Sequence, residues 1–325
     1  MQDLRRDMMN NINENVKQIK ENIGQVIIGK GHVIELVLNA LINKGHILLE
    51  SVPGTGKTML AKSFAASISA TFKRIQFTPD VLPSDVTGIQ FFNPKEQDFQ
   101  LRPGPVMTNI LLADEINRAT PRTQSSLLEV MEERQVTIDG ETRKLPIPFI
   151  VIATQNPIES QQGTFPLPEA QMDRFFVQID LGYPSLEEEK EIMRTYRTGN
   201  PIDTIKAVFT KEQIEQMQQD VQAVKISEDV EDYLVRIVHA TRNSQDVEVG
   251  VSPRGTLALM KAVQGRAYIS GRNFVTPEDI KFMAPFVLPH RLVLTMDGSL
   301  KKTNKQVIKE ILTSVSVPVE AGAVN

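Results

Sequence analysis

The sequence predicts an α/β protein, with a parallel sheet flanked by helices followed by a small all-helical region. Three observations support this prediction. An apolar run at 47–49 leads through a glycine-rich turn into a helix-forming segment. Short apolar segments then alternate with helical ones up to residue 181, which is typical of a parallel sheet buried on both faces. Beyond Gly182-Tyr183-Pro184 the apolar residues recur at helical spacing, so we place a domain boundary there.

Composition limits the classes of function. A chain of 325 residues exceeds an average domain, so we expect about two domains. The net charge of −4 gives no overall attraction for nucleic acid or anionic lipid, although a local patch remains possible. The sequence has no cysteine, which excludes disulfides, cysteine-ligated zinc and thiol catalysis. No apolar run reaches transmembrane length and we recognise no signal peptide, so we expect no membrane insertion. The lack of cysteine is compatible with a reducing cytoplasm, where we expect the protein to act.

Apolar spacing predicts the secondary structure in chain order. Residues 1–24 form one apolar helical face closed by Gly24, which favours a helix packed on the core over a free partner-binding helix. A second helix is expected to pass through 33–41 and to end near Gly45. After the run at 47–49, strands are expected at 74–77, 109–113, 149–153 and 175–181. Helices are expected at 186–197, 211–224, 229–242, 253–267, 277–284 and 305–312.

Two hairpins are expected to interrupt the α/β region. The first pairs 88–92 with 99–101, and strand alternation suggests that one of Phe91 and Phe92 is buried. The second pairs 135–138 with 141–145 around Asp139-Gly140, a strong hairpin signal.

The glycine-rich turn has the order of a phosphate-binding loop. It reads Ser51-Val52-Pro53-Gly54-Thr55-Gly56-Lys57-Thr58 between a predicted strand and a predicted helix. Backbone N–H groups and the helix N-terminus favour phosphate oxygens, Lys57 adds a full charge, and the Thr58 hydroxyl can reach Mg²⁺. Ser51 stands where the full pattern has glycine, and a glycine-rich turn that binds nothing is the alternative.

Polar residues after the predicted strands supply the other groups that ATP hydrolysis needs. Asp114 and Glu115 follow the strand at 109–113, where one carboxylate can hold the Mg²⁺ hydration shell and the other can activate water; solvated acids at a strand end are the alternative. Asn156 can bind the γ-phosphate or simply belong to an Asn-Pro turn. Arg174 and Arg254 can both stabilise charge on a phosphoryl group. The alternatives are that Arg174 forms an ion pair with a neighbouring acid and that Arg254 is an ordinary surface residue.

These residues carry a resemblance to the MoxR-type AAA+ ATPases. It extends from VIIGK at 26–30 to VTPEDI at 275–280, and its most specific blocks are RIQFTPDVLPSDVTG, RPGPVMTNILLADEINRATPRTQSSLLEVMEERQVTIDG and VIATQNPIESQQGTFPLPEAQMDRF. The resemblance implies an AAA+ core at 25–183 after the N-terminal helix at 1–24. It also implies a helix-2 insert at 85–104, a hairpin before the sensor strand at 134–148, a helical lid at 184–300, and a C-terminal helix and tail at 301–325.

The resemblance also implies roles for individual residues. ATP is expected on residues 51–58, with Mg²⁺ held at Thr58 and Asp114. Glu115 is expected to activate water, with Lys57 on the phosphates. Asn156 falls at the first sensor, Arg174 at the arginine finger and Arg254 at the second sensor, in cis or in trans. Ile27, Ile28 and Gly29 fall where the family lines the adenine.

The family resemblance implies a ring of like subunits, usually a hexamer, that remodels, assembles or matures client proteins. A partner with a von Willebrand factor A domain is expected; the sequence does not name the client. A nucleic-acid motor is one alternative, although the hairpin mixes Arg134, Arg143 and Lys144 with Asp139 and Glu141. The other alternative is a nucleotide-gated scaffold that does not hydrolyse ATP. The joint presence of Lys57, Asp114 and Glu115 argues against it.

Overall fold

The structure is a computed structural model of the chain, and it describes residues 14–50, 52, 54–156, 164–197 and 199–318. The predicted N-terminal helix is described from residue 14 onward, and 14–24 are helical. Ser51, Pro53 and the tail from 319 lie outside the described residues.

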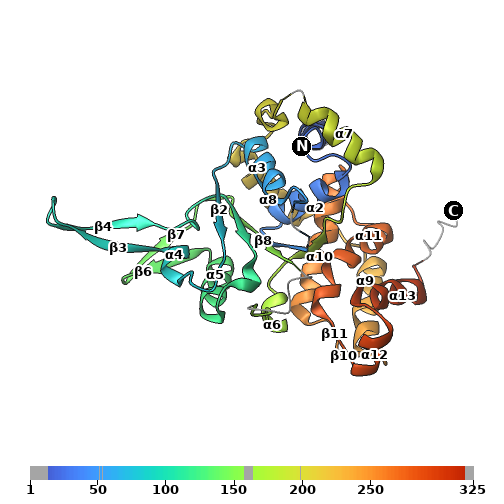
Figure 1. Cartoon of the computed structure of the whole chain (residues 1–325). Helices are drawn as coiled ribbons and strands as arrows, with labels where there is room; N and C mark the ends of the chain where they lie inside the picture. Colours follow the sequence, from blue (N-terminus) through green and yellow to red (C-terminus); the bar gives the residue numbers. More distant parts are fainter. Residues whose placement is uncertain (1–13, 51, 53, 157–163, 198, 319–325) are drawn as a thin grey trace.

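A five-stranded parallel sheet forms the centre of the molecule (Figure 1). The strand order is β2-β5-β8-β1-β9, and every neighbouring pair is parallel. The strands are β1 (Ile47–Glu50), β2 (Phe72–Gln76), β5 (Ile110–Asp114), β8 (Ile150–Gln155) and β9 (Val177–Asp180). Because all five run the same way, their carboxyl ends lie along one edge of the sheet and their amino ends along the other. The predicted parallel sheet is confirmed.

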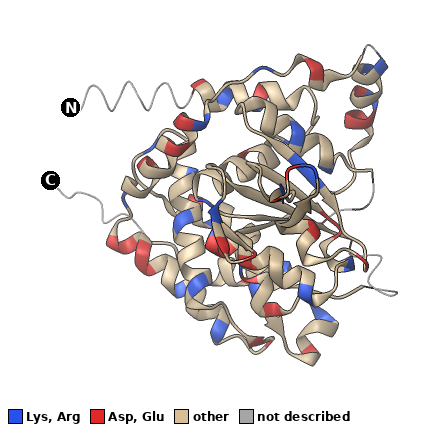
Figure 2. Cartoon of the chain, turned by 90° about the vertical axis from the view of Figure 1, so that its left-hand side faces the viewer, with Lys and Arg blue, Asp and Glu red and all other residues tan. Residues whose placement is uncertain are grey.

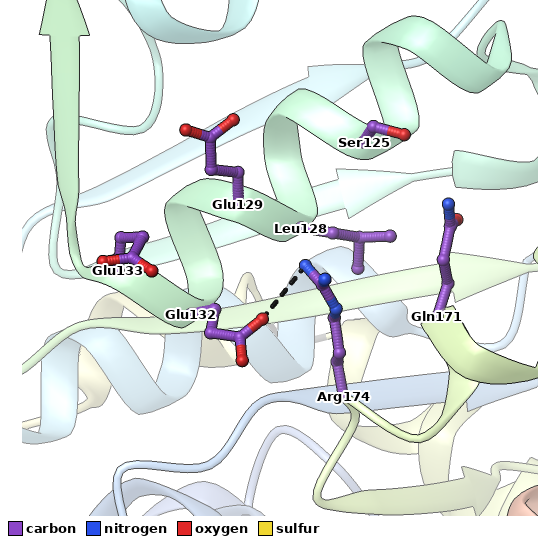
Figure 3. Close-up of a pocket in the computed structure, with 7 residues that line it drawn as sticks. All are labelled: Ser125, Leu128, Glu129, Glu132, Glu133, Gln171 and Arg174. Carbon is purple, nitrogen blue, oxygen red and sulfur yellow. Dashed lines mark ion pairs between the residues drawn. The ribbon is translucent and has the colours of Figure 1, made fainter.

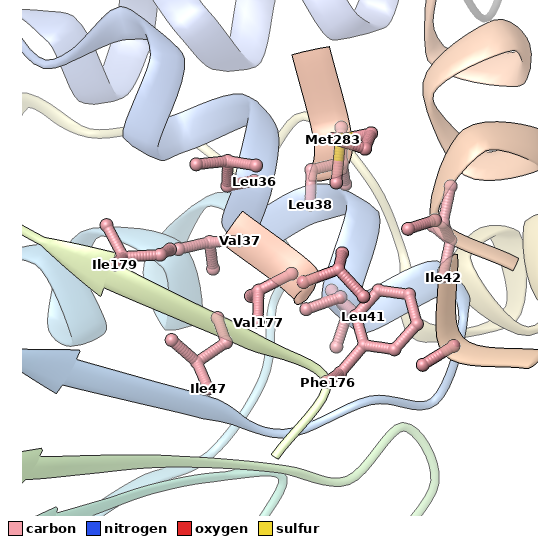
Figure 4. Packing of buried hydrophobic residues seen from close by; sticks show 14 of the residues in the cluster. Leu36, Val37, Leu38, Leu41, Ile42, Ile47, Phe176, Val177, Ile179 and Met283 are labelled. Atoms are coloured by element: carbon pink, nitrogen blue, oxygen red, sulfur yellow. The ribbon is translucent and has the colours of Figure 1, made fainter. Parts of the chain in front are cut away.

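Alternate residues of the strands enter two separate buried clusters, because successive side chains of a strand point to opposite faces. Ile47 and Leu49 join one cluster while Leu48 joins the other. The first cluster contains α2 (Gly31–Ile42) and α3 (Lys57–Ser67), and Figure 4 shows Leu36, Val37 and Leu41 beside the strands. The second cluster contains α5 (Pro121–Glu133), which follows the 3₁₀ turn η1 (Ile116–Arg118).

Both predicted hairpins are present. After the short helix α4 (Pro83–Thr87), β3 (Gly88–Asn93) pairs with β4 (Asp98–Pro103), and the pair projects from the body (Figure 1). The second hairpin pairs β6 (Gln135–Ile138) with β7 (Glu141–Lys144). A Cβ on Gly104 would come within 2.2 Å of the Val86 carbonyl oxygen, so the base of the projecting hairpin requires glycine.

The expectation that one phenylalanine of the first hairpin is buried is wrong. Phe91 and Phe92 are 42% and 51% exposed, and Phe99 is 65% exposed. The hairpin is a two-stranded ribbon that projects from the body, so neither of its faces lies under a helix (Figure 1). Phe92 packs edge-on against Phe99 across the strands, with ring centroids 5.5 Å apart.

Helices dominate the chain after β9, as predicted. They are α7 (Leu186–Arg197), α8 (Lys211–Asp220), α9 (Glu228–Arg242), α10 (Pro253–Ile269), α11 (Pro277–Val287), α12 (Met296–Lys301) and α13 (Asn304–Ser314). The short turns are α6 (Glu169–Met172), which precedes β9, and η2 (Pro201–Thr204), η3 (Val221–Ala223) and η4 (Pro289–Arg291). The region is not all-helical, because β10 (Val247–Val249) pairs antiparallel with β11 (Val293–Leu294).

The helical region packs directly on the sheet domain. One buried cluster runs from α2 through β1 and β9 to α10 and α11, and Figure 4 shows Met283 beside α2. The Asn39 amide donates to the Ala262 carbonyl at 2.9 Å, and a Cβ on Gly265 would meet Asn39 at 2.2 Å. The predicted domain limits therefore stay a prediction. Within the described residues, no helix has the length and apolarity that crossing a bilayer requires.

Candidate active site

The glycine-rich loop joins β1 to α3 at the carboxyl edge of the sheet. Gly54 and Gly56 have φ of 85° and 87°, a left-handed conformation that favours glycine. Gly56 is the N-cap of α3, and among the described residues no side-chain hydrogen bond caps this helix. Within that part of the chain, the first N–H groups of α3 therefore have no capping side chain and are available to an anion. Thr55 closes the loop by donating its hydroxyl hydrogen to the Val52 carbonyl at 3.1 Å.

Lys57 and Asp114 face each other beneath this loop. Lys57 Nζ lies 3.9 Å from Asp114 Oδ1, and the two side chains are only 10% and 8% exposed. Asp114 ends β5, and its Oδ1 accepts the Thr154 hydroxyl hydrogen at 2.6 Å. Its Oδ2 accepts from Nη2 and Nε of Arg74 at 2.6 and 3.2 Å. The structure thus brings together the lysine and the first carboxylate that the sequence singles out.

Glu115 stands beside Asp114 in a strained conformation. Its φ of 57° and ψ of 50° lie in the left-handed region, which is uncommon for a residue other than glycine. The Glu115 N–H donates to Thr154 Oγ1 at 2.9 Å, and Glu115 Oε2 accepts from Gln76 Nε2 at 2.8 Å. Arg118 Nε lies 3.2 Å from the same carboxylate oxygen. Asn156 is buried directly after β8, the neighbouring strand of the sheet.

The segment predicted to line the adenine lies beside the loop. A Cβ on Gly56 would be 3.9 Å from Ile27 Cδ1, so Ile27 borders the loop, and Ile28 is buried next to it. Gly29 has a φ of 75°, and a Cβ there would collide with the Glu188 carboxylate of α7. Lys30 Nζ donates to the Tyr183 carbonyl at 3.4 Å, so the start of the helical region closes this side.

The donor set fits a magnesium–nucleotide complex. No cluster of three or more His, Asp or Glu side chains that could hold a metal alone occurs among the described residues. Mg²⁺ commonly binds through one or two protein oxygens, several waters and the phosphates of its nucleotide. Asp114, the Thr58 hydroxyl and the uncapped helix end match that requirement.

Arg174 and Arg254 lie away from the loop. Arg174 immediately precedes Phe175-Phe176 and β9, so it belongs to the amino edge of the sheet, whereas the loop lies at the carboxyl edge. At about 3.3 Å per residue, the four residues of β1 separate the two edges by roughly 13 Å. Both arginines instead meet Glu132 on α5, with N···O distances of 3.2 Å for Arg174 and 2.9 Å for Arg254. Figure 3 shows the pair formed by Arg174.

A pocket of about 280 Å³, which we call the basic pocket, lies around these arginines. Its lining includes six basic side chains: Lys44, Arg134, Arg174, Arg254, Lys261 and Arg291. Only two acidic side chains, Glu132 and Asp173, are among the described residues that line it. This excess of positive charge favours an anion.

The arginine segment is fixed to the helical region by partly buried polar contacts. Asp173 accepts from Arg291 Nε at 2.7 Å and from the Ser252 hydroxyl at 2.9 Å. Ser252 is the N-cap of α10, whose first turn carries Arg254. Burial lowers the pKa of Arg291 to about 10, although the Asp173 carboxylate opposes this shift, so the guanidinium is charged at neutral pH.

Sequence reasoning missed three contributors to these sites. Thr154 lies within an apolar strand and reads as an ordinary β-former. Arg74 lies on the outer strand β2 and contacts Asp114 forty residues away. Glu132 is one of several acids at the end of a helix, and only its three-dimensional neighbours distinguish it.

Comparisons with known proteins agree with this geometry. Residues 46–177 match the model of the ATPase family associated with various cellular activities (AAA), and residues 239–311 match an AAA lid domain. The chain is 42% identical over 306 residues to Chaperone MoxR1 of Mycobacterium tuberculosis, covering 91% of this chain and 80% of that protein. This chain belongs to the MoxR family of AAA+ ATPases.

Two further similar proteins match nearly the whole chain. Protein YeaC of Bacillus subtilis, which has no described function, is 50% identical over 305 residues, 94% of this chain and 95% of its own length. A crystal structure from Cytophaga hutchinsonii, of a protein provisionally described as an ATPase, superposes with a TM-score of 0.89 at 36% identity. The superposition covers 96% of this MoxR chain and 98% of the Cytophaga chain. Nucleotide binding and ATPase activity follow from this membership.

Proposed function

We propose that this MoxR protein is a Mg²⁺-dependent ATPase that acts as a ring of like subunits, usually six, to remodel or mature client proteins. The proposal of a ring rests on one observation. The loop with Lys57 lies at the carboxyl edge of the sheet, whereas Arg174 and Arg254 lie at the amino edge. One subunit alone cannot direct these arginines at its own triphosphate. A neighbour that presents its basic pocket to the loop supplies the missing positive charge.

In each composite site, this subunit's loop binds the phosphates, with residues 51–58 around them and Ile27, Ile28 and Gly29 beside the adenine. Thr58 and Asp114 would hold Mg²⁺, which screens phosphate charge when bound. Glu115 orients and deprotonates the attacking water, and Asn156 contacts the γ-phosphate. Arg174 and Arg254 of the neighbour stabilise the charge of the transition state. The partly buried contacts of Asp173 link the two segments that carry these arginines.

Subunit mixing tests this arrangement. Lys57→Ala should lose nucleotide binding, while Arg174→Ala should bind ATP, assemble and hydrolyse slowly. Mixed together, they should regain activity, because some interfaces then pair an intact loop with an intact arginine. Lys62→Ala, an exposed lysine on the same helix α3, is the matched control and should behave as wild type. If no mixing ratio exceeds the activity of either parent, action in trans is wrong. The mass of the complex with and without ATP tests the ring itself.

We infer a protein client rather than a nucleic acid. Figure 2 looks at the side from which the hairpin projects and shows acidic and basic residues interspersed. On the second hairpin, Arg143 is already paired with Glu141 at 2.8 Å. The first hairpin exposes Phe91, Phe92 and Phe99, which suit apolar segments of a client. The name of the MoxR1 relative, a chaperone, agrees with this proposal.

Turnover with and without duplex DNA separates the alternatives. DNA-stimulated turnover with binding that weakens steeply in salt would favour a nucleic-acid motor, and no turnover at all would favour a scaffold. We expect neither. Phe92→Ser should reduce ATP-dependent protection of a heat-denatured reporter enzyme while basal turnover survives. Leu300→Ser, on α12 and 80% exposed, is the control. We place the protein in the cytoplasm, with which the lack of cysteine is compatible, and expect a von Willebrand factor A domain partner from the family resemblance.

A further inference from the structure

Glu132 joins three separate parts of the chain. It lies in the last turn of α5, and each of its carboxylate oxygens contacts a different arginine. Oε2 is 3.2 Å from Arg174 Nη1, in the segment before β9, and Oε1 is 2.9 Å from Arg254 Nη2, in the first turn of α10. Figure 3 shows Glu132 and Arg174 facing each other, while Glu129 and Glu133 point elsewhere from the same helix.

The charges around Glu132 make this contact significant. The other acid of the basic pocket, Asp173, already accepts hydrogen bonds from Arg291 and Ser252. Among the described residues that line this pocket, Glu132 is therefore the acid that pairs with both Arg174 and Arg254. Two guanidinium groups repel each other at short range unless an anion lies between them. The Glu132 carboxylate occupies that place in the isolated subunit.

An arginine that is held in advance loses less conformational freedom when it binds its target. Fixing a free arginine side chain costs up to about 2 kcal/mol of rotamer entropy. Arg174 and Arg254 are 32% and 50% exposed, so each side chain reaches solvent and its contact with Glu132 restricts its conformational freedom. A γ-phosphate carries more charge and more acceptor oxygens than one carboxylate, so it can take over both arginines on arrival.

We propose that Glu132 is a positioning residue, which holds Arg174 and Arg254 as a preset pair and releases them to the γ-phosphate of the neighbouring subunit. This inference rests on the proposed action of Arg174 in trans. In this proposal Glu132 does not contact the nucleotide bound by its own subunit, because Glu132 acts through the two arginines.

Turnover at saturating ATP provides the first test. Glu132→Ala should lower kcat by about three- to tenfold, as expected for the loss of two partly exposed ion pairs, while KM for ATP and assembly stay unchanged. Glu132→Gln should lose nearly as much, because its amide NH₂ cannot accept from the second arginine. Glu133→Ala, one residue further on α5 and exposed, is the matched control and should keep wild-type kcat. A raised kcat, or a KM that rises with unchanged kcat, would overturn the positioning role.

Mixing provides the second test, and it separates this inference from the proposed function. Glu132→Ala subunits keep an intact loop, and Lys57→Ala subunits keep an intact set of Glu132 and both arginines. A mixture should therefore exceed the activity of either parent. If Arg174→Ala with Lys57→Ala regains activity but Glu132→Ala with Lys57→Ala does not, Glu132 acts in its own subunit and the inference is wrong. If both mixtures fail, the proposed action in trans is wrong.

Discussion

Arg291 and Asp173 form an ion pair that is almost closed to solvent, with Nε 2.7 Å from Oδ1 and side-chain exposures of 2% and 18%. Arg291 belongs to the helical region, whereas Asp173 directly precedes Arg174 and β9. The Arg291 guanidinium also donates to the carbonyls of Phe175 and Val287. The position of Arg174 relative to the sheet therefore depends on a residue more than a hundred positions later in the chain.

We expect Arg291→Met to destabilise the protein strongly. Removing one partner of a buried pair leaves the other charge uncompensated, which costs about 3–5 kcal/mol of the free energy of unfolding. Urea denaturation followed by circular dichroism measures this loss. The control is Arg236→Met, since Arg236 pairs with Asp232 on the surface with exposures of 40% and 65%. An exposed pair contributes about 0–1 kcal/mol, so equal losses in the two variants would contradict the structural role of Arg291.

Glu115→Gln should bind ATP but nearly stop turnover. The amide keeps the shape of the side chain and one oxygen that can accept from Gln76, but it cannot take a proton from water. A general base contributes about 10²–10⁴-fold to a rate, so kcat should fall by that order while the affinity for nucleotide is retained. Single-turnover hydrolysis and a fluorescent-nucleotide titration measure the two quantities. Glu129→Gln, an exposed acid on α5, is the control; unchanged turnover in Glu115→Gln would move the water-activating role elsewhere.

The sequence indicates these proposed catalytic groups because their chemistry fixes both residue type and position. The loop requires Gly54 and Gly56 at positive φ, and the carboxylates must follow a buried strand, so the expected strand at 109–113 lies within one residue of β5. The helix predicted at 186–197 coincides with α7, because its apolar residues recur at helical spacing.

Contacts between distant segments leave no such pattern in the sequence. Glu132 and Arg254 are separated by 122 positions, and nothing in either local sequence identifies the partner. The strands β10 and β11 have three and two residues, which is too short for an alternation to be recognised. In the sequence, strand alternation predicts that one of Phe91 and Phe92 is buried. The two-stranded ribbon that carries them projects into solvent, so both are exposed.

His46 should make stability depend on pH. Burial, reinforced by the charge of Arg134, lowers the pKa of His46 to about 3 from its ordinary value of 6.5. Its ring is satisfied as the neutral form, since Nδ1 accepts the Val151 N–H at 2.9 Å and Nε2 lies 3.0 Å from the Met131 carbonyl. Between pH 6.5 and 3 the unfolded chain binds a proton here that the folded chain does not. The free energy of unfolding must therefore fall as the pH is lowered through this window.

We expect His46 alone to account for about 2 kcal/mol of the loss between pH 7 and pH 5. Urea denaturation at both pH values measures the difference. His46→Gln should reduce this pH dependence even though it also lowers stability at pH 7. His239→Gln, an exposed histidine on α9, is the control. A pH dependence in His46→Gln as large as in wild type would show that the loss arises elsewhere, with the buried His290 the first alternative, because its pKa is lowered in the same direction.

Thr154 links the two proposed catalytic carboxylates, Asp114 and Glu115. Its hydroxyl donates to Asp114 Oδ1 at 2.6 Å and accepts the N–H of Glu115 at 2.9 Å. The second contact matters because Glu115 sits at a φ of 57°, a conformation that persists in a residue with a Cβ only when surrounding contacts impose it. One hydroxyl therefore orients the proposed metal carboxylate and holds the backbone that carries the proposed water-activating carboxylate.

Thr154→Val removes that hydroxyl while nearly keeping the shape of the side chain. A buried hydrogen-bonding group left without its partner costs about 1–3 kcal/mol, and the displaced Glu115 should lower kcat by about tenfold or more. ATP binding should survive, because Lys57 and the loop are untouched, but half-maximal activity should require more Mg²⁺. Thr154→Ser is the matched control, since it keeps the oxygen and loses only a methyl group. Should the valine variant match the serine variant in kcat and in Mg²⁺ requirement, the contacts of Thr154 would be structural detail without consequence for turnover.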